Sequence, residues 1–190
     1  MNFWQGKKIR LRGIEPSDAE CIYRWNLDSD RARHLDFVWP PSSVASVKAW
    51  AEEKSKQTFA NDTFHWIIET LEGCPVGTLS THSCNPHTGT FSYGVDVAEE
   101  DRGKGYATEA ILLVLRYYFE ELRYQKVTVV VHGNNAASIQ LHERLGFQRE
   151  GVHRRMVFTQ GQHFDDIWYG MTREEFQEIV AKRGRLENYG

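Results

Sequence analysis

The sequence predicts an α/β fold of the α+β kind, in which helices cover a mixed sheet. Two observations support this class. Three extended runs follow one another from Phe64 to Val97, and turn residues at 72–73 and 85–89 join them as in an antiparallel meander. A helical pattern then leads to the β-branched run KVTVVV, and this order predicts a right-handed crossover between parallel strands.

The chain ahead of the meander predicts one strand and two helices. Residues 8–11 alternate basic and aliphatic side chains, which predicts a first strand. A helix should begin near Ser17, which has the capping-box spacing to the glutamate three residues later. Residues 31–43 show no period and are expected to be irregular. A second helix should begin after Ser42 or Ser43, because apolar residues then recur at spacings of three and four.

The chain behind the meander predicts further helices and strands in alternation. One helix should run from Gly105 to about Leu122 and lead into the strand of residues 126–131, whose continuous β-branched run predicts burial on both faces. A second helix lies in HGNNAASIQLHERLGF and should end at Gly146, because glycine takes the left-handed conformation of a helix cap. Phe147 should begin the next strand, and a helix containing REEF should close the fold.

The length and charge of the chain limit its organisation and its partners. A chain of 190 residues is most simply one domain, because it buries a sufficient core by itself. We expect residues 1–184 to form this domain and residues 185–190 to be a tail. The net charge of −3 argues against nonspecific binding to nucleic acid and mildly favours cationic partners such as amines.

The cysteines and the apolar runs indicate the compartment. Cys21, Cys74 and Cys84 form no C-x-x-C pair, and the histidines show no metal-binding spacing, so neither a disulfide framework nor a metal site is expected. The longest aliphatic runs, ILLVL and VTVVV, are too short to span a bilayer, and MNFWQGKKIRLR has no apolar signal core. We therefore expect a cytoplasmic protein that binds neither membrane nor nucleic acid.

The stretch from Tyr93 to Thr108 joins an extended segment to a helix through a glycine-containing turn and predicts an anion site. The first backbone N–H groups of a helix lack partners, and the helix dipole favours negative charge there. Arg102 and Lys104 add positive charge, and the glycines beside them let the backbone approach a ligand closely. The residues after the second glycine do not match a nucleotide P-loop, so a different phosphate-bearing cofactor is expected; the alternative is a plain helix start with solvated basic residues.

A second group of polar residues lies in HGNNAASIQLHERLGF. Asn135, Ser138 and His142 are three and four residues apart and should share one face of the helix. The adjacent apolar face should carry Ala137, Leu141 and Leu145. A helix that directs an amide, a hydroxyl and an imidazole one way indicates a functional face.

Arg-x-x-Gly-x-Ala, from Arg102 to Ala107, resembles the acyl-CoA pyrophosphate loop of the GNAT superfamily of N-acetyltransferases. HGNNAASIQLHERLGF and GQHFDDIWYGM resemble the branch that contains ribosomal-protein N-terminal acetyltransferases and spermidine acetyltransferases. The resemblance extends from the KIRLR strand to the REEF helix. It implies a mixed, mostly antiparallel sheet of about seven strands that splays between strands 4 and 5, with helices on both faces and acetyl-CoA in the gap.

The same resemblance implies which residues bind acetyl-CoA. Val95 and Val97 would bond to the pantetheine arm through their backbone. Asn135 would contact the arm through its side chain, and Ser138 is a lesser candidate. The pyrophosphate would lie on the loop made of Arg102, Gly103, Lys104, Gly105, Tyr106 and Ala107.

The resemblance also implies catalytic positions, but this sequence departs from the family pattern at two of them. His142 stands where many relatives carry a tyrosine that protonates the departing thiolate, so it is our candidate general acid; the alternative is a histidine merely packed beside the cofactor. Ser92 stands where the branch often has a glutamate, which leaves the general base open. Asp96 shares a strand face with Ser92 and is a candidate base, although solvation of the strand surface would also explain it.

Three other acidic residues have structural explanations. Asp165 and Asp166 match an acidic position in the family tail and lie on a strand leading out of a turn. Glu109 lies in the first turn of a helix, where the helix dipole explains it. The segments 30–43 and 159–166 are the least patterned and should shape the pocket for the acceptor.

The function expected from these features is transfer of an acetyl group from acetyl-CoA to a primary amine, by direct attack in a ternary complex. The acceptor would be the α-amine of a protein N-terminus or a small-molecule amine. A polyamine or aminoglycoside acetyltransferase is the alternative among enzymes. An acyl-CoA sensor without turnover is the alternative of another class. Related proteins are often dimers, so the resemblance also implies a homodimer.

Overall fold

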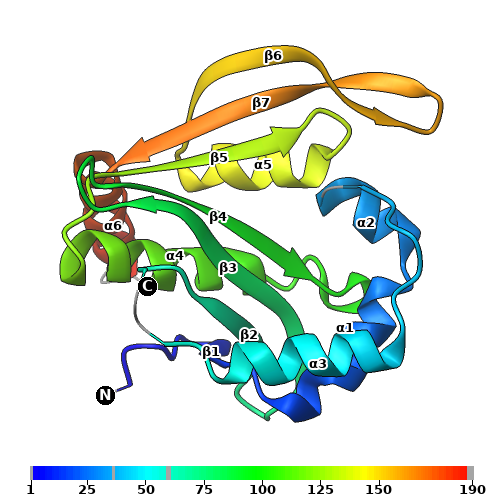
Figure 1. The fold of residues 1–190 in the computed structure, drawn as a ribbon. Coiled ribbons are helices and arrows are strands. Elements are labelled where there is room, and N and C mark those ends of the chain that lie inside the picture. The colour runs from blue at the N-terminus through cyan, green and yellow to red at the C-terminus, as the bar shows by residue number, and fades with distance from the viewer. Residues whose placement is uncertain (1, 36, 59–60, 188–190) are drawn as a thin grey trace. The chain divides into compact units, whose positions relative to one another are not determined.

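The computed structural model describes residues 2–35, 37–58 and 61–187, and its sheet has seven strands in the order β1-β2-β3-β4-β5-β7-β6 (Figure 1). The strands are β1 (Ile9–Gly13), β2 (His65–Thr70), β3 (Pro75–Asn85), β4 (Thr90–Val97), β5 (Lys126–His132), β6 (Gln148–Thr159) and β7 (Gln162–Thr172). β4 and β5 are parallel, whereas β1–β2, β2–β3, β5–β7 and β6–β7 are antiparallel pairs. The predicted mixed, mostly antiparallel sheet is confirmed.

Six α-helices accompany the sheet in the part of the chain that the structure describes. They are α1 (Ala19–Asn26), α2 (Ser29–Leu35), α3 (Val44–Ser55), α4 (Tyr106–Arg116), α5 (Ala136–Leu145) and α6 (Arg173–Glu187). Short 3-10 turns, Pro16–Asp18 and Glu99–Asp101, precede α1 and α4, and a π-helical turn, Tyr117–Glu121, continues α4. Within the described ranges, no helix is both long and apolar enough to cross a bilayer. The boundary expected between residues 184 and 185 falls inside α6.

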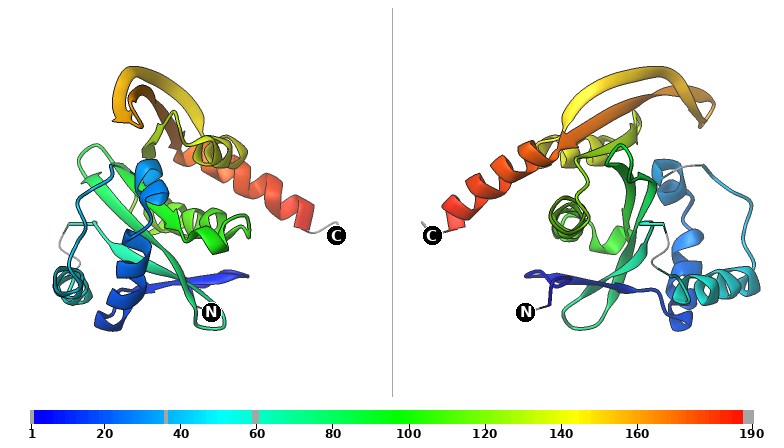
Figure 2. Two further views of the ribbon diagram at one scale, coloured as in Figure 1. Left: turned by 90° about the vertical axis from the view of Figure 1, so that its right-hand side faces the viewer. Right: turned by 60° about the vertical axis from the view of Figure 1, so that its left-hand side comes forward.

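The chain divides into two compact units, of which the first comprises Met1–His82 and Tyr93–Val114. In this unit α1 packs against α3 around a buried apolar cluster. The cluster consists of Ile14, Ala19, Ile22, Trp25, Val47, Ala51, Ile67 and Ala98. Figure 2 shows α4 on the side of β2 and β3 that faces away from α1 and α3. Helices therefore cover both faces of these strands, as the sequence analysis expects.

The second unit comprises Ser83–Ser92 and Leu115–Gly190 and has an aromatic core. Phe91 stacks on Tyr118 with the ring centroids 4.0 Å apart, and Tyr124 meets Phe91 edge-on at 5.6 Å. All three side chains are buried. The parallel pairing of β4 with β5 belongs to this unit and joins Thr90–Ser92 to Lys126–Thr128. The aromatic core thus lies beside the parallel pairing of β4 with β5, which includes Phe91.

The predicted irregular segment of residues 31–43 begins with helix instead. Residues 31–35 are the last five of the seven residues of α2. The helix begins there because Asp28 Oδ1 accepts hydrogen bonds from the N–H groups of Asp30 at 2.9 Å and Arg31 at 3.0 Å. A seven-residue helix has too few turns to show a period, which is why the sequence pattern missed it.

Of the two predicted N-terminal helix caps, one agrees with the structure and the other does not. Ser43 Oγ accepts from the N–H of Ser46 at 3.0 Å, which confirms Ser43 as the cap of α3. The predicted box at Ser17 is wrong, because a 3-10 turn precedes α1. In that turn Asp18 Oδ2 accepts from the N–H of Glu15 at 2.8 Å. The chain therefore enters α1 two residues later than expected.

Two burial patterns also differ from prediction. Val130 is 42% exposed, so β5 is not buried on both faces. The buried residues of α5 are His142 and Leu145, whereas Ala137 at its start is exposed. Gly146 follows α5 with φ +97° and confirms the left-handed cap. The polar face of α5 is therefore partly a buried face, which changes the chemistry expected of His142.

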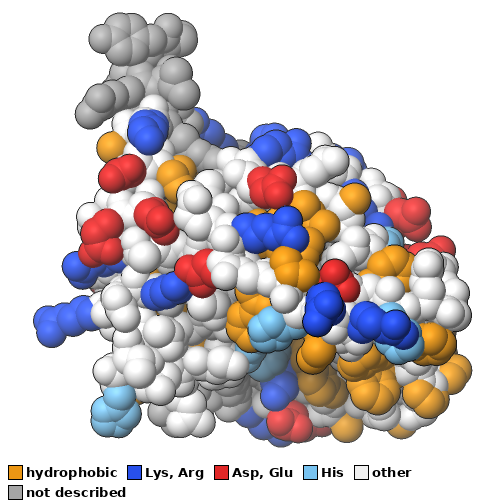
Figure 3. Space-filling view, turned by 90° about the horizontal axis from the view of Figure 1, so that it is seen from above, with side chains coloured by type: hydrophobic (Ala, Val, Ile, Leu, Met, Phe, Trp, Pro, Cys, Tyr) orange, Lys and Arg blue, Asp and Glu red, His pale blue; other side chains and the backbone are white. Residues whose placement is uncertain are grey.

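β6 is the edge strand after β7 and exposes several apolar side chains. They are Val152, Met156 and Phe158. Figure 3 looks onto the side of the molecule where β6 lies and shows hydrophobic side chains interleaved with Lys and Arg. The β6–β7 ladder shifts register twice along β6. Bulges and basic side chains are features that discourage uncontrolled pairing of an edge strand.

Candidate active site

The predicted anion loop connects β4 to α4 in the first unit. Both of its glycines are left-handed, with φ +77° at Gly103 and +86° at Gly105. A Cβ atom added at Gly103 would meet nothing within 4 Å, so the backbone there is open. In the described part of the chain, the N–H groups of Gly103 and Gly105 donate to no backbone carbonyl. Open N–H groups ahead of a helix N-terminus are what an anion requires.

The two cations of this loop are held differently. Arg102 Nε donates to the carbonyl oxygen of Val97 at 3.3 Å, so its guanidinium turns back towards the end of β4. Lys104 Nζ forms a salt bridge with Asp101 Oδ1 at 2.7 Å, and this hydrogen bond raises the pKa of the Lys104 ammonium. Arg102 therefore lies beside the end of β4, whereas the charge of Lys104 is partly neutralised by Asp101.

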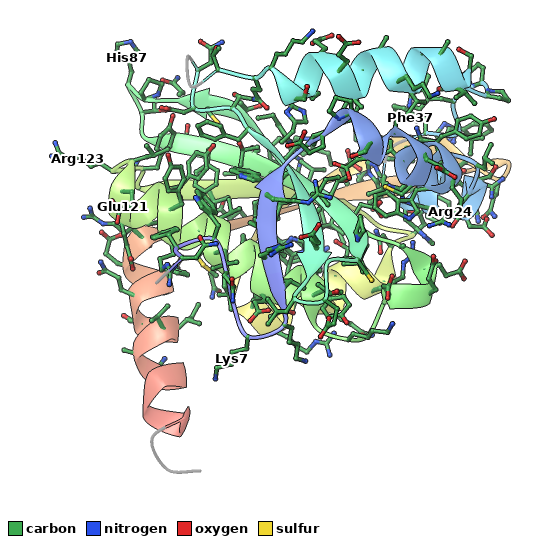
Figure 4. All side chains as sticks on the ribbon, turned by 90° about the horizontal axis from the view of Figure 1, so that it is seen from below. Lys7, Arg24, Phe37, His87, Glu121 and Arg123 are labelled. Carbon is green, nitrogen blue, oxygen red and sulfur yellow. The ribbon has the colours of Figure 1, made fainter. Side chains whose placement is uncertain are left out.

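Glu109 and Lys8 tie the start of β1 to this loop. Glu109 lies in the first turn of α4, and its Oε2 accepts from the N–H groups of Lys8 at 2.9 Å and Ile9 at 3.0 Å. Its Oε1 accepts from the N–H of Lys7, which Figure 4 labels in the turn before β1. Lys8 Nζ donates to the carbonyl oxygen of Lys104 at 2.8 Å. The dipole interaction expected for Glu109 is thus accompanied by specific hydrogen bonds that the sequence analysis missed.

Asp96 is buried on β4 and forms an ion pair with Arg31 of α2. The two side chains are 9% and 10% exposed, and the guanidinium lies 5.8 Å from the centroid of the Trp25 ring. Burial raises the pKa of the Asp96 carboxyl, and the neighbouring Arg31 charge offsets part of that shift. Solvation of the strand surface is therefore the wrong explanation for Asp96. Its role as a base stays a prediction and would compete with the ion pair.

In the second unit, Asn135, Ser138 and His142 are linked as their spacing predicts. Asn135 caps α5, and its Oδ1 accepts from the N–H of Ser138 at 3.0 Å. His142 Nδ1 lies 2.8 Å from the carbonyl oxygen of Ser138 and 3.3 Å from its Oγ. The amide oxygen of Asn135 is therefore engaged in the cap of α5, and its predicted contact with a cofactor stays a prediction.

His142 is a buried histidine whose hydrogen bond defines its tautomer. The side chain is 3% exposed and lies edge-on to Phe147, with ring centroids 5.1 Å apart. A carbonyl only accepts, so Nδ1 carries the proton and Nε2 of the neutral ring is an acceptor. Burial lowers the pKa of His142. Nε2 donates a proton only from the imidazolium form, so the predicted acid role requires a form that burial disfavours.

The remaining candidate residues of the second unit are engaged with neighbours. Ser92 Oγ lies 3.1 Å from Thr128 Oγ1 across the β4–β5 pair, and its catalytic role stays a prediction. Asp166 Oδ1 lies 2.8 Å from His132 Nδ1. Asp165 Oδ1 accepts from the N–H of Arg155 at 2.9 Å. Both aspartates therefore have structural partners, although the sequence did not indicate which residues these are.

Comparison with known proteins identifies the family. A family model described as "Acetyltransferase (GNAT) domain" matches residues 8–148. Over 177 residues the chain is 41% identical to the SPbeta prophage-derived N-acetyltransferase YokL of Bacillus subtilis, with 93% of this chain and 97% of that protein covered. It is 25% identical over 158 residues to a spermidine N(1)-acetyltransferase of Vibrio cholerae, with 83% and 89% covered.

A solved structure shows the same fold. The crystal structure of spermidine N-acetyltransferase from Vibrio cholerae in complex with CoA and spermine matches with a TM-score of 0.79 at 20% sequence identity. The match covers 90% of this chain and 99% of that one. The family model covers most of the chain, and the relatives are named as N-acetyltransferases. The chain is therefore an acyltransferase that belongs to the GNAT acetyltransferase family.

Proposed function

We propose that the protein transfers the acetyl group of acetyl-CoA to a primary amine, by direct attack of the amine in a ternary complex. The observation that carries this proposal is the loop of Arg102–Ala107. Its two left-handed glycines, open N–H groups and two cations precede α4, as a pyrophosphate site requires. The relatives named as spermidine acetyltransferases support an amine as the acceptor.

The family resemblance assigns three groups of residues to acetyl-CoA. The pyrophosphate would bind Arg102, Gly103, Lys104, Gly105, Tyr106 and Ala107. The backbone of Val95 and Val97 would hold the pantetheine arm, and Val97 would do so while its carbonyl oxygen also accepts from Arg102. Asn135 would contact the pantetheine arm through its side chain, with Ser138 as a lesser contact. Bound acetyl-CoA would supply an acetyl group activated as a thioester.

Proton transfer limits which amines react readily. A protein α-amine has a reference pKa of about 7.7–8.0 and is partly neutral at pH 7, whereas a lysine-like amine of pKa about 10.4 is almost wholly protonated. The first acceptor class therefore needs little help from a base. The second requires one, and Asp96, paired with Arg31, would have to release its partner to serve. We propose the α-amine class first and keep His142 as the candidate acid.

A polyamine or aminoglycoside acceptor is the alternative, and the carboxylates around α2 bear on it. Such polycations need clustered carboxylates that are open to solvent. The sequence offers only Asp36 and Asp28 or Asp30 near the expected acceptor pocket, and Asp36 lies outside the described residues. Asp28 caps α2, and Asp30 forms a salt bridge with Arg33. Both carboxylates are therefore already engaged, although Asp30 itself is exposed. The negative net charge of the chain and the spermidine acetyltransferase relatives are what favour this alternative.

We place the reaction in the cytoplasm, because Cys21, Cys74 and Cys84 are all free thiols. The homodimer implied by the resemblance stays a prediction, and analytical ultracentrifugation of the full chain would test it. Among the described residues, no cluster of His, Cys, Asp and Glu could hold a metal ion.

The test of the proposed function is release of free CoA from acetyl-CoA across N-terminal peptides, polyamines and aminoglycosides. A reaction without amine corrects for thioester hydrolysis and for the three protein thiols. Release with peptides alone supports the α-amine class, and release with polyamines alone supports the alternative. Binding of acetyl-CoA with no release for any amine would favour a sensor over the enzyme.

A further inference from the structure

The backbone at the start of β1 and in the turn before it binds the carboxylate of Glu109, which belongs to α4. The N–H groups of Lys7, Lys8 and Ile9 all donate to the carboxylate of Glu109. Gly6 closes the turn by donating its N–H to the carbonyl oxygen of Ile9 at 2.8 Å. Three successive N–H groups aimed at one carboxylate fix the first turn of α4 against this segment.

Gly6 makes room for this contact. A Cβ atom added at Gly6 would lie 2.3 Å from the carboxyl carbon of Glu109, which no real contact permits. The carboxylate therefore lies in a space that only glycine leaves open. The segment from Gly6 to Ile9 is consequently hydrogen-bonded to the start of α4, although about 100 residues separate them along the chain.

The side chain of Lys8 extends this contact to the anion loop. Its ammonium donates to the carbonyl oxygen of Lys104 at 2.8 Å and lies 3.3 Å from the position of a Cβ atom on Gly105. In a trans peptide the C=O of one residue and the N–H of the next point in opposite directions. With the Lys104 carbonyl held by Lys8, the N–H of Gly105 points away from Lys8.

We infer that Lys8 and Glu109 are positioning residues that set the anion loop before the cofactor binds. Lys8 fixes the Lys104–Gly105 peptide, and Glu109 fixes the backbone of Lys8 to α4. This inference rests on the proposed function, in which the N–H of Gly105 faces the pyrophosphate. Lys8 lies on the carbonyl side of that peptide, so it acts through the loop rather than on a phosphate.

The reason such positioning affects binding is the freedom of Gly105. Glycine populates several backbone conformations at similar free energy, so an unheld Lys104–Gly105 peptide would rotate. The population of loops with the N–H facing the ligand would then fall, and the apparent affinity would fall with it. A charge-assisted hydrogen bond is strong enough to restrict that rotation by about tenfold.

The experiment measures the affinity of CoA by titration calorimetry and the backbone order parameters of the loop by NMR in the free protein. The variants are Lys8→Met, Lys8→Arg and Glu109→Gln. Lys48→Met on α3 is the matched control, because it removes the same charge from an exposed helix position. Melting temperatures show that each variant is folded.

Lys8→Met should raise the Kd of CoA about tenfold and lower the order parameter of Gly105 from about 0.85 to below about 0.6 before CoA is added. Lys8→Arg should restore most of both, because its guanidinium also donates to a carbonyl. Glu109→Gln should loosen the same loop, because its NH2 group would face backbone N–H groups. Lys48→Met should change neither quantity.

Two results would overturn the inference. One is a Lys8→Met variant that binds CoA as the wild type does. The other is weakened binding with an unchanged free loop, which would make Lys8 a direct phosphate ligand. If the wild type binds no CoA, the proposed function fails instead, and the order parameters of the free protein still report on the contact itself.

Discussion

Replacing Arg31 with methionine should lower the free energy of unfolding by about 3–5 kcal/mol, because it leaves the carboxylate of Asp96 buried without its partner. Both side chains are at most 10% exposed, so the pair is not a surface salt bridge of about 0–1 kcal/mol. Methionine keeps most of the length of the arginine stem. It removes the charge and the contact of the guanidinium with the Trp25 ring.

The helix itself offers the control for this substitution. Arg33 of α2 pairs with Asp30, whose side chain is 79% exposed, so Arg33→Met should lower stability by less than about 1 kcal/mol. A double variant, Arg31→Met with Asp96→Leu, should be more stable than Arg31→Met alone, because it no longer buries an unpaired charge. The order of the three variants therefore tests the ion pair and not the helix.

The assay is urea unfolding followed by far-UV circular dichroism, with equal m-values as the check that the variants unfold alike. The reasoning is refuted if Arg31→Met and Arg33→Met lose the same small amount of stability. It is equally refuted if adding Asp96→Leu to Arg31→Met lowers the free energy of unfolding by as much as a substitution that is independent of Arg31 would. Either result would mean that Asp96 reaches solvent or another cation.

Three further predictions concern single residues. Asp96→Asn should leave kcat for a peptide α-amine within about threefold of wild type, whereas loss of about 100-fold or more at all pH values would identify Asp96 as the base. Burial lowers the pKa of His142, so the unfolded state binds more protons below pH about 6.5, and stability should fall as the pH drops from there towards the folded pKa, by at most about 1.4 kcal/mol per pH unit. His142→Phe should remove the contribution of His142 to the slope of stability against pH, while His65 and His82, whose pKa values burial also lowers, still contribute. An unchanged slope in chemical unfolding between pH 7 and 5 would contradict this. Gly146→Ala should cost about 1–2 kcal/mol, measured as a lower urea midpoint, because φ is +97° and the new Cβ would lie 2.6 Å from Ile179 Cδ1; a wild-type midpoint would show that the cap relaxes.

Local signals explain what the sequence predicted of the fold and the site. The left-handed cap at Gly146 follows from a glycine after a helical stripe, and the meander follows from alternation and turn residues. The loop of Arg102–Ala107 is likewise contiguous, so its glycines and cations could be read directly. Each of these features needs only a few neighbouring residues to specify it.

The contacts that the sequence did not reveal join residues that are far apart along the chain. The Arg31–Asp96 pair spans 65 residues, and the contact of Lys8 with Lys104 spans 96. No local period marks which arginine meets which aspartate. His142 shows the same limit in another way, because its spacing places it beside Ser138, but its burial depends on Phe147 and the neighbouring strand β7. Burial in turn decides its protonation.

The most direct test of the acetyltransferase assignment is one reaction in which free CoA and the mass of the amine acceptor are measured together. The account predicts one acetylated amine for each CoA released. It also predicts that Arg102→Met, which removes a loop cation, raises the KM for acetyl-CoA far more than the KM for the amine. CoA release without an acetylated amine, or an Arg102→Met variant with both KM values unchanged, would contradict it.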